Sequence, residues 1–587
     1  MKRRWVRALA LLPVAALLPL NSASADVPTS APILVAATKR ADKGTLKVVA
    51  HGVPQGQSAK ITIAGKKYRK KLPRAGKLRN LRPGTYRVWA APIVADGGTA
   101  AVPDLPVKVR VRKHKRAVLR LQYSWNPKAD SYPPSPATGV EVVDRGLDHI
   151  TLRWVNGQAP DLQSVAIRRK QGSQPPAGLD DGRVVPGDRL ATSVTDDGLR
   201  SHTTYSFSVF MVDLAGNVSK PATVTIRTKG VAAQLTAGMQ HTCALLRDSD
   251  PKGDVGGSAQ STVVECWGAN EHGQVGDGST ADAPEPVAVD LTDVVQVAAG
   301  GDHTCARQRG GTVRCWGRND SGQLGRDDTS DANRPVAVDL PDAVDVAAGT
   351  DHTCAVLTTG AVRCWGANEH GQLGTPPGGF EPRPVTVSGI TTAVSVTAGY
   401  AHTCVTLANG SVRCWGANDQ GQLGNNSRTD SSVPVRPITG VVTAVTAGVF
   451  HTCALLADGS VSCWGANDYG QIGDASTTDR LVPTSVAVTG AVSLSAGAYH
   501  TCATQSSGAV RCWGRNSAGR LGDGTQIDRS TPTRVSGVTG ALAVVAGGYH
   551  SCALTASGSL CWGSNSAGQL GNGTTTTSLR AVPVSGL

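Results

Sequence analysis

The sequence predicts an all-β protein, a seven-bladed β-propeller preceded by two β-sandwich domains. First, one short phrase recurs at a period near 50 residues after residue 230, which is typical of propeller blades. Second, short runs of alternating apolar and polar residues predict strands on both sides of that boundary. Third, all 14 cysteines lie in the repeats, two in each copy. The histidine that opens the phrase recurs as His241, His303, His352, His402, His451, His500 and His550.

Residues 1–25 have the pattern of a secretion signal. Basic residues at the start precede an apolar run over 8–20, and Ala23-Ser24-Ala25 is a small-residue cleavage site. The run is too short to span a bilayer, and no later apolar stretch is long enough. We therefore expect a secreted or cell-surface protein without a membrane span. The style of the signal and the content of Ala, Gly and Arg indicate a bacterial source.

Residues 26–125 are predicted to form a basic β-sandwich, because apolar residues alternate in several short runs. The segment Leu81-Arg-Pro-Gly-Thr-Tyr86 resembles the turn of prealbumin-like sandwiches. This region holds 22 Lys and Arg against four Asp. Such charge on an exported protein favours an anionic cell-envelope polymer, although a merely soluble basic face is the alternative. Nucleic acid is disfavoured because few aromatic residues interleave with the cations. The candidate polymer-binding residues are Lys66, Lys67, Arg69, Lys70, Lys71, Arg110, Arg112 and Lys113.

Residues 134–229 follow a proline-rich joint and form the second predicted sandwich. The run His149-Ile-Thr-Leu-Arg-Trp154, the strand Tyr205–Phe210 and the ending Asp213–Ser219 resemble a fibronectin type III module. The resemblance implies a spacer domain.

The repeats over residues 230–587 predict disulfides. In the fifth copy, Ala457-Asp458-Gly459 reads as a hairpin loop that sets Cys453 opposite Cys463, close enough for a bond. Zinc is the alternative, but the paired Cys-x2-Cys knuckles are missing, and an even count in an exported chain favours disulfides. The seven expected pairs are Cys243 with Cys266, Cys305 with Cys315, Cys354 with Cys364, Cys404 with Cys414, Cys453 with Cys463, Cys502 with Cys512, and Cys552 with Cys561.

Most of the repeated residues are predicted to be structural. The tryptophan of each Cys-Trp-Gly should pack between blades, each repeated histidine should bond to neighbouring loop backbone, and each following asparagine should hold the next loop. The last strand is expected to close the ring by lying beside the N-terminal blade.

The repeated pattern Ala-Gly-x-x-His, then Cys-Trp-Gly, then Asn-x-x-Gly-Gln-Leu-Gly resembles the regulator of chromosome condensation repeat. The resemblance covers about residues 230–587 and implies a seven-bladed propeller. The family namesake is a nuclear guanine-nucleotide exchange factor on chromatin. Other members are secreted bacterial propellers that inhibit β-lactamases through aromatic residues on one face. This chain departs from the namesake in its signal peptide, its cysteine pairs and its acidic propeller, which has 20 Lys and Arg against 29 Asp and Glu.

Functional residues should lie where the repeats differ. The loops after the first and third strands of a blade open on the same face, and both vary among the copies. Aromatic and charged residues on one rigid face favour recognition of a protein or glycan. The alternative is that the tyrosines cover gaps between blades and the acids solvate the rim. The candidate residues are Tyr400, Phe450, Tyr469, Tyr499, Tyr549, Glu271, His272, Asp302, Asp351, Glu369 and His370.

No catalytic signature occurs, such as a Gly-x-Ser-x-Gly elbow, a phosphate loop or a His-Glu-x-x-His site. The prediction is therefore a secreted, monomeric, non-enzymatic binding protein that needs no cofactor or metal. Its propeller face would bind a protein or glycan, and its basic domain would attach to an anionic envelope polymer. An extracellular polysaccharide-acting hydrolase is the alternative, since paired carboxylates in the face loops are compatible with one. Nucleotide exchange would require a cytoplasmic protein.

Overall fold

The computed structural model describes residues 43–587 except 54–56, 67, 96–97, 103–104, 114, 127–131, 160 and 248–261. The predicted signal, Lys67 and residues 248–261, which include the extra residues between Cys243 and Cys266 of the first repeat, lie outside the described residues. The predicted all-β architecture is confirmed, because every named element is a strand. One compact unit contains the first sandwich and the other contains the propeller, with the second sandwich contributing to both. Over the described ranges, no helix has the length and hydropathy needed to cross a membrane.

The first sandwich consists of two main sheets around one core, with strand orders β4-β1-β9 and β3-β2-β5-β8, and a small third sheet of order β10-β7-β6. Alternation builds the core, because Ile61 and Ile63 point inward from β2 while Thr62 and Ala64 point outward. The strands are β1 (Gly44–His51), β2 (Ile61–Gly65), β3 (Tyr68–Leu72), β4 (Lys77–Leu81), β5 (Gly84–Ala90), β6 (Ile93–Ala95), β7 (Gly98–Ala101), β8 (Val107–Val111), β9 (Arg116–Gln122) and β10 (Ser124–Asn126).

The second sandwich pairs the sheet β11-β12-β15 with the sheet β14-β13-β16-β17. Trp154 of β12 is buried, and the amide of Arg200 donates a hydrogen bond to the Tyr205 hydroxyl at 3.0 Å. Its assignment as a fibronectin type III module stays a prediction. The strands are β11 (Thr138–Arg145), β12 (His149–Val155), β13 (Leu162–Gln171), β14 (Arg183–Val185), β15 (Ser193–Asp197), β16 (Thr204–Asp213) and β17 (Ala222–Arg227).

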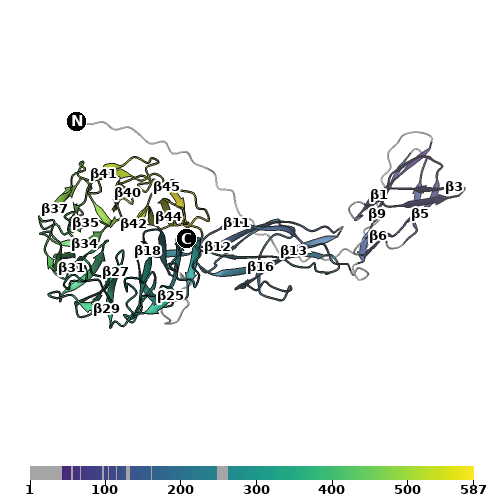
Figure 1. Cartoon of the computed structure of the whole chain (residues 1–587). Helices are drawn as coiled ribbons and strands as arrows, with labels where there is room; N and C mark the ends of the chain where they lie inside the picture. The colour runs from purple at the N-terminus through teal and green to yellow at the C-terminus, as the bar shows by residue number, and fades with distance from the viewer. Residues whose placement is uncertain are drawn as a thin grey trace, which may run out of the picture. The chain divides into compact units, whose positions relative to one another are not determined.

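Seven four-stranded antiparallel sheets form the propeller, and each takes four consecutive strands of the chain. They follow one another around a ring, from teal at β18 to yellow at β45 (Figure 1). Blades 1 to 4 are β18 (Val231–Ala237), β19 (His241–Arg247), β20 (Thr262–Gly268), β21 (Ala283–Val289); β22 (Val294–Ala299), β23 (His303–Gln308), β24 (Val313–Gly317), β25 (Ala332–Ala337); β26 (Ala343–Ala348), β27 (His352–Leu357), β28 (Val362–Ala367), β29 (Phe380–Thr386); β30 (Ala393–Ala398), β31 (His402–Leu407), β32 (Val412–Gly416), β33 (Ser431–Val435). Blades 5 to 7 are β34 (Val442–Ala447), β35 (His451–Leu456), β36 (Val461–Gly465), β37 (Arg480–Val486); β38 (Ala491–Ala496), β39 (His500–Gln505), β40 (Val510–Gly514), β41 (Arg529–Arg534); β42 (Ala541–Ala546), β43 (His550–Thr555), β44 (Gly558–Gly563), β45 (Ser578–Pro583).

The second and third strands of each blade form the hairpin that the sequence predicts. In blade 5, Leu455 pairs with Val461 and Cys453 with Cys463, while Gly459 in the turn has φ of +77°.

A disulfide joins the two cysteines of every blade, and their Cα atoms lie 4.0–4.1 Å apart. Each bond crosslinks the two central strands within a blade, and none connects one blade to another. The pairing is the one that the sequence predicts, and it leaves no cysteine free for zinc. From blade 1 to blade 7, the bonds join Cys243 to Cys266, Cys305 to Cys315, Cys354 to Cys364, Cys404 to Cys414, Cys453 to Cys463, Cys502 to Cys512, and Cys552 to Cys561.

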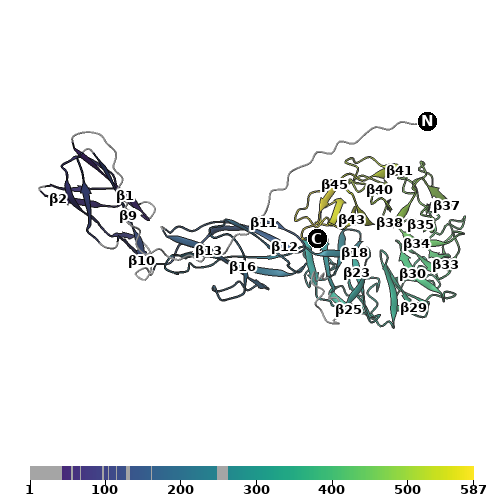
Figure 2. The ribbon, with the colours of Figure 1, turned by 180° about the vertical axis from the view of Figure 1, so that it is seen from behind.

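The predicted mode of ring closure is wrong. The last strand, β45, pairs with β44 inside blade 7 instead of joining the first blade. Blade 7 lies beside blade 1 in both ribbon views (Figures 1 and 2). The contact between them is made by packing and by hydrogen bonds, without a shared strand: Trp267 of blade 1 shares a buried cluster with Leu570 and Leu587, and its indole donates to the carbonyl of Gln569 at 3.0 Å. The repeat boundary in the sequence coincides with a blade boundary, so no strand is left over to be shared.

Candidate recognition face of the propeller

A closed circuit of buried histidines holds the seven blades together. The Nε2 atom of each repeated histidine lies 2.6–2.9 Å from the hydroxyl of a Thr or Ser in the next blade, and His550 closes the circuit onto Thr242. Each hydroxyl in turn donates to a backbone carbonyl, as Thr501 does to Gln471 at 2.9 Å. Since its one proton is used there, the hydroxyl accepts from the histidine, which must carry its proton on Nε2. The predicted loop-backbone partner of these histidines is therefore replaced by a side-chain hydroxyl.

Burial keeps these histidines neutral. Desolvation lowers the pKa of His241 and His451 to about 4 and that of His303, His352 and His402 to about 3. The circuit is therefore uncharged at neutral pH. It serves as a rigid frame and not as a set of ligands.

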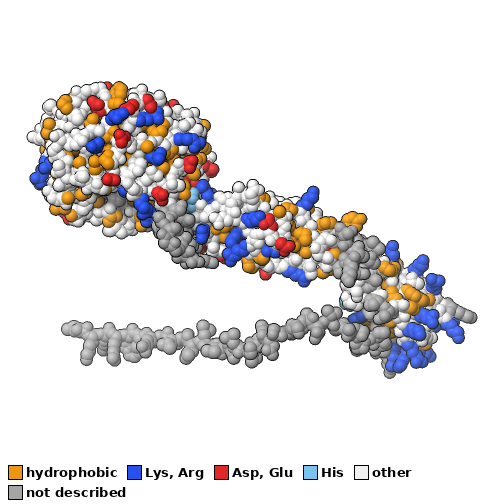
Figure 3. Space-filling model, turned by 90° about the horizontal axis from the view of Figure 1, so that it is seen from below, with side chains coloured by type: hydrophobic (Ala, Val, Ile, Leu, Met, Phe, Trp, Pro, Cys, Tyr) orange, Lys and Arg blue, Asp and Glu red, His pale blue; other side chains and the backbone are white. Residues whose placement is uncertain are grey.

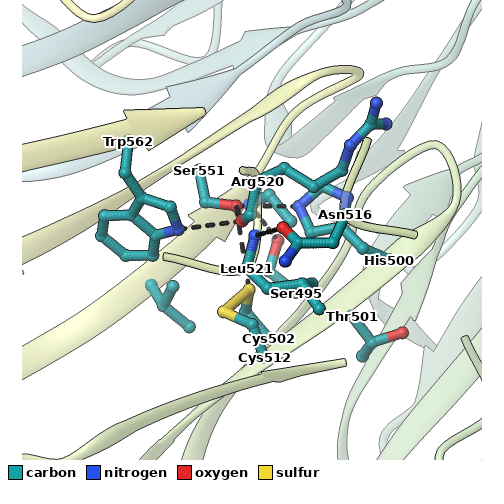
Figure 4. Close-up of a disulfide and its surroundings, with 12 residues drawn as sticks. Ser495, His500, Thr501, Cys502, Cys512, Asn516, Arg520, Leu521, Ser551 and Trp562 are labelled. Carbon is teal, nitrogen blue, oxygen red and sulfur yellow. Dashed lines mark hydrogen bonds between the residues drawn. A yellow bond between two sulfur atoms is a disulfide. The ribbon is translucent and has the colours of Figure 1, made fainter. Parts of the chain in front are cut away.

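The repeated tryptophans and asparagines complete this frame, as Figure 4 shows around the Cys502–Cys512 disulfide. The Trp562 indole donates to the carbonyl of Arg520 in the preceding blade at 2.8 Å. The Asn516 side chain accepts from the Leu521 amide at 3.0 Å and so holds the loop after β40. The packing of Trp562 between blades 6 and 7 and the loop contact of Asn516 were predicted from the sequence, whereas the indole hydrogen bond was not. These contacts fix the loops that carry the variable residues.

Small residues surround the central channel on the side where the variable loops open. The Ala-Gly pairs that end each first strand line a cavity of about 90 Å³, together with Met239, Thr350 and Val449. The variable residues before each histidine directly follow these glycines in the sequence. The candidate residues that precede the histidines therefore border this cavity, which is too small for a large ligand.

Four of the predicted aromatic residues form one continuous row across blades 4, 5 and 6. The ring centroids of Tyr400 and Phe450 are 5.5 Å apart, those of Phe450 and Tyr499 are 6.2 Å apart, and those of Tyr499 and Tyr469 are 5.5 Å apart. Tyr400 is the most accessible, with 42% of its surface exposed. Rings in contact at these distances support one another, so the row is a preformed apolar surface.

Two arginines that the sequence did not predict lie against the aromatic rings, Arg515 beside the row and the buried Arg520 beside Tyr549. The Arg515 guanidinium lies 4.7 Å from the Tyr469 ring centroid and 5.4 Å from that of Tyr499. Arg520 lies 5.1 Å from the Tyr549 ring and donates to the carbonyl of Gly548 at 2.9 Å. Burial lowers the pKa of Arg520 to about 10, so it remains charged at neutral pH. The signal was present, because Arg515 replaces the usual Ala of Cys-Trp-Gly-Ala-Asn and Arg520 replaces the usual Gln of Gly-Gln-Leu-Gly.

Blades 2 and 3 carry an acidic group instead. Asp302 and Asp351 lie 3.9 and 3.8 Å from the guanidinium of Arg318, which also bonds to Asp320. Burial raises the pKa of both Asp302 and Asp351. The predicted face is thus divided along the ring, with carboxylates in blades 2 and 3 and the aromatic row in blades 4 to 6.

The remaining predicted residues flank the acidic group. His272 and His370 bond to Asp331 and Asp430 of the following blade at 2.8 and 2.7 Å. Glu271 and Glu369 are exposed beside these histidines. Both histidines therefore brace neighbouring loops, and this leaves them less free to contact a partner.

Within the described ranges, no group of three or more His, Cys, Asp or Glu side chains is arranged to hold a metal ion. Among the candidate residues, Asp302 and Asp351 are the carboxylates whose pKa is raised by burial, which favours their neutral form. Their shared contact with Arg318 opposes that effect. The chemistry that this face offers most directly is apolar and cation–π contact.

Residues 263–586 match the family model described as the RCC1-like domain. The chain belongs to this family. The match supports a binding or regulatory role for the RCC1-like propeller. Among the curated proteins, none matches the sequence.

Three solved structures are similar to this chain. Yeast RCC1 (Prp20) bound to Kap60 is 23% identical with a TM-score of 0.49, over 55% of this chain and 83% of that one. Prp20p from Saccharomyces cerevisiae, whose binding to Gsp1p and histones was studied, is 22% identical with a TM-score of 0.49, over 61% and 87%. Human WBSCR16 is 23% identical with a TM-score of 0.47, over 56% and 88%. At these identities the likeness concerns the fold alone.

Proposed function

We propose that this protein is a secreted, non-enzymatic binding protein whose propeller face recognises a protein or glycan. The aromatic row with its stacked arginines carries the proposal. Aromatic and arginine side chains in a rigid, partly buried setting are the groups that dominate binding energy at interfaces. Because the rings already contact one another, little side-chain freedom would be lost when a partner binds.

The compartment is part of the proposal. Seven disulfides fit an oxidising environment, and residues 1–25 have the pattern of a secretion signal. The basic first sandwich would keep the secreted protein at the cell surface through an anionic envelope polymer. The second sandwich would act as the spacer.

The test is capture by the immobilised full chain from secreted proteins and solubilised envelope glycans, with identification by mass spectrometry. Replacing Tyr400, Phe450 and Tyr499 by Ala should weaken binding of the captured partner at least about 30-fold, because hot-spot truncations typically cost about 2 kcal/mol or more each. Phe380→Ala is the matched control, since Phe380 is similarly exposed (46%) but lies on β29 outside these loops. Equal binding by the triple variant and the control would refute the assignment of the face.

A polysaccharide-acting hydrolase remains the second candidate, favoured by the raised pKa values of Asp302 and Asp351. Release of reducing ends from an envelope or plant glycan, lost in Asp302→Asn and retained in the aromatic variant, would replace the binding proposal with this one.

A further inference from the structure

One face of the first sandwich collects cations from three strands. In the sheet β3-β2-β5-β8, residues paired directly across strands point to the same side. Thr62 and Ala64 point away from the core, so their partners do as well. These partners are Arg69 and Lys71 on β3 and Arg87 and Trp89 on β5. On β8, Lys108 pairs with Arg87, and Arg110, two residues further along β8, points to the same side. We call these six residues the cationic face.

The strand pairing shows which of the predicted polymer-binding residues lie on the cationic face. Arg69, Lys71 and Arg110 lie on the cationic face. Lys70 pairs with Ile63, so its side chain starts from the opposite side of the edge strand β3, the side that faces the core. Arg112 and Lys113 follow the end of β8, and Lys66 follows the end of β2. Arg87, Lys108 and Trp89 were not predicted, because no run of basic residues marks them.

The charge on this face is not balanced within the described part of the domain. All five cations are exposed, and the described residues between 43 and 126 include no Asp or Glu. Figure 3 shows Lys and Arg gathered on this sandwich with no acidic side chain visible on the side presented. Arg87 lies directly opposite Lys108, an arrangement of like charges that destabilises a sheet. A bound anion would relieve this repulsion.

The arrangement fits an extended chain. The small side chains of Thr62 and Ala64 form a strip along β2, with Arg69 and Lys71 on one side and Arg87 and Trp89 on the other. The flanking strands are about 9.6 Å apart, since neighbouring strands are spaced by about 4.8 Å. Successive outward residues on one strand are about 6.7 Å apart. That distance is comparable to the separation of neighbouring phosphates in an extended polyol phosphate.

We infer that the cationic face binds an extended phosphodiester-linked polyol or sugar polymer, aligned with β2. The cations pair with successive phosphates, and the half-buried Trp89 ring offers a flat surface to a sugar. Trp89 is the one aromatic residue on this face, because Tyr68 and Tyr86 are paired with Gly65 on the core side and contact each other. Single-stranded nucleic acid instead favours several aromatic platforms in series. The inference rests on the proposed attachment of the first sandwich to an anionic polymer and assigns that attachment to one face.

The test compares two full-length variants that lose the same charge. The first carries Arg69→Gln, Arg87→Gln and Lys108→Gln on the cationic face. The control carries Lys77→Gln, Arg79→Gln and Arg120→Gln on the other sheet. Immobilised glycerol phosphate polymer is the probe, and affinity is measured between about 50 and 200 mM salt. The first variant should bind at least about tenfold more weakly, and its slope of log affinity against log salt should fall by about 2, as expected for three lost phosphate contacts.

Each other outcome has a distinct meaning. Equal loss in both variants would overturn the assigned face while leaving an anionic attachment in place. Failure of the unaltered chain to bind this polymer or any of the anionic probes below would overturn the attachment itself, without affecting the propeller face. Equal or tighter binding to hyaluronate, to a thymidine homopolymer or to phosphatidylserine vesicles would overturn the phosphodiester polymer as the ligand. Trp89→Ala should weaken binding of a glycosylated polymer and leave binding of inorganic polyphosphate unchanged. Trp89→Phe should restore binding of the glycosylated polymer. If Trp89→Ala weakened binding of the two polymers equally, the sugar contact would be overturned.

Discussion

Removing one hydroxyl from the histidine circuit should destabilise the propeller by an amount that depends on the blade. Thr501 is fully buried; its hydroxyl accepts from His451 at 2.9 Å and donates to the carbonyl of Gln471 at 2.9 Å. Thr501→Val keeps the side-chain shape but leaves both groups without this partner. An unsatisfied buried polar group costs about 1–3 kcal/mol, so the free energy of unfolding should fall by about 2–6 kcal/mol.

A neighbouring blade provides the matched comparison. Thr452 makes the same two bonds to His402 and Gln422, but the Gln422 carbonyl also accepts from the Trp464 indole at 2.9 Å. The corresponding Trp513 indole in the next blade has no hydrogen-bond partner among the residues that the structure describes. Thr452→Val therefore leaves only the histidine without a hydrogen-bond partner, and it should lower the free energy of unfolding by about 1–3 kcal/mol. Thr501→Ser keeps the hydroxyl and should cost less than about 1 kcal/mol, which is the value of one buried methyl group.

Urea unfolding under oxidising conditions, followed by tryptophan fluorescence, measures these differences. The expected order of stability is wild type, then Thr501→Ser, then Thr452→Val, then Thr501→Val. Equal stability of the Val and Ser variants at position 501 would refute the argument that the hydroxyl stabilises the ring by satisfying buried polar groups. Equal costs for the two Val variants would refute the assigned role of the tryptophan bond.

Acidification from pH 7 to 5 should lower the melting temperature steeply, because the unfolded histidines bind protons below about pH 6.5 whereas folded ones with pKa values of about 3 to 4 do not. Each histidine should lower the free energy of unfolding by about 1 kcal/mol per pH unit on average in this window, approaching about 1.4 kcal/mol per unit near pH 5. A flat calorimetric profile down to pH 5 would contradict it. Replacing Cys453 and Cys463 by Ala should lower the free energy of unfolding by about 2–3 kcal/mol. Replacing Cys243 and Cys266 should lower it by about 0.7 kcal/mol more, because these cysteines are separated by 23 residues rather than 10 and close a longer loop. Urea unfolding of the two variants compares these losses. Arg515→Ala should weaken binding of a partner captured by the propeller face about tenfold or more, and Arg515→Lys should recover only part of the lost affinity, because the planar guanidinium stacks on the tyrosines. Titration calorimetry with that partner measures the affinities. Full recovery by the Lys variant would mean that the charge alone matters.

The repeated part of the fold was predictable because all seven copies carry the same pattern, so the features that they share stand out from those of any single copy. The spacing of Cys453 and Cys463 around Gly459 fixes a hairpin register, and a register determines which side chains share a face. Ring closure was not predictable in this way, because hydropathy does not distinguish a fourth strand that pairs within its blade from one that pairs across the ring. The hydrogen-bond partner of His451 was also missed, since Thr501 is 50 residues away and only the curvature of the ring brings it close.

The candidate site was predictable in its aromatic half. Phe450 and Tyr499 directly precede the repeated histidine and Tyr400 stands two residues before it, so all three lie in the same variable loop of consecutive repeats and are expected to be neighbours. The arginines required a different comparison, in which Arg515 stands out as a departure from the Ala that most repeats carry at this position. The cationic face depended on pairing between strands that are distant in sequence, which brings Arg69 and Lys108 onto one surface although no single segment contains both.

The absence of a shared strand at the ring closure makes the junction between blades 7 and 1 chemically like the other six. His550 donates its hydrogen bond to Thr242 as every other histidine does to its neighbour, and each blade carries its own crosslink. A tandem duplication or deletion in the gene that falls between blades would therefore add or remove a self-contained unit, with a donor on one side and an acceptor on the other. Such an architecture allows the recognition surface to be reshuffled one blade at a time, because the chemistry that joins the blades is separate from the residues that vary.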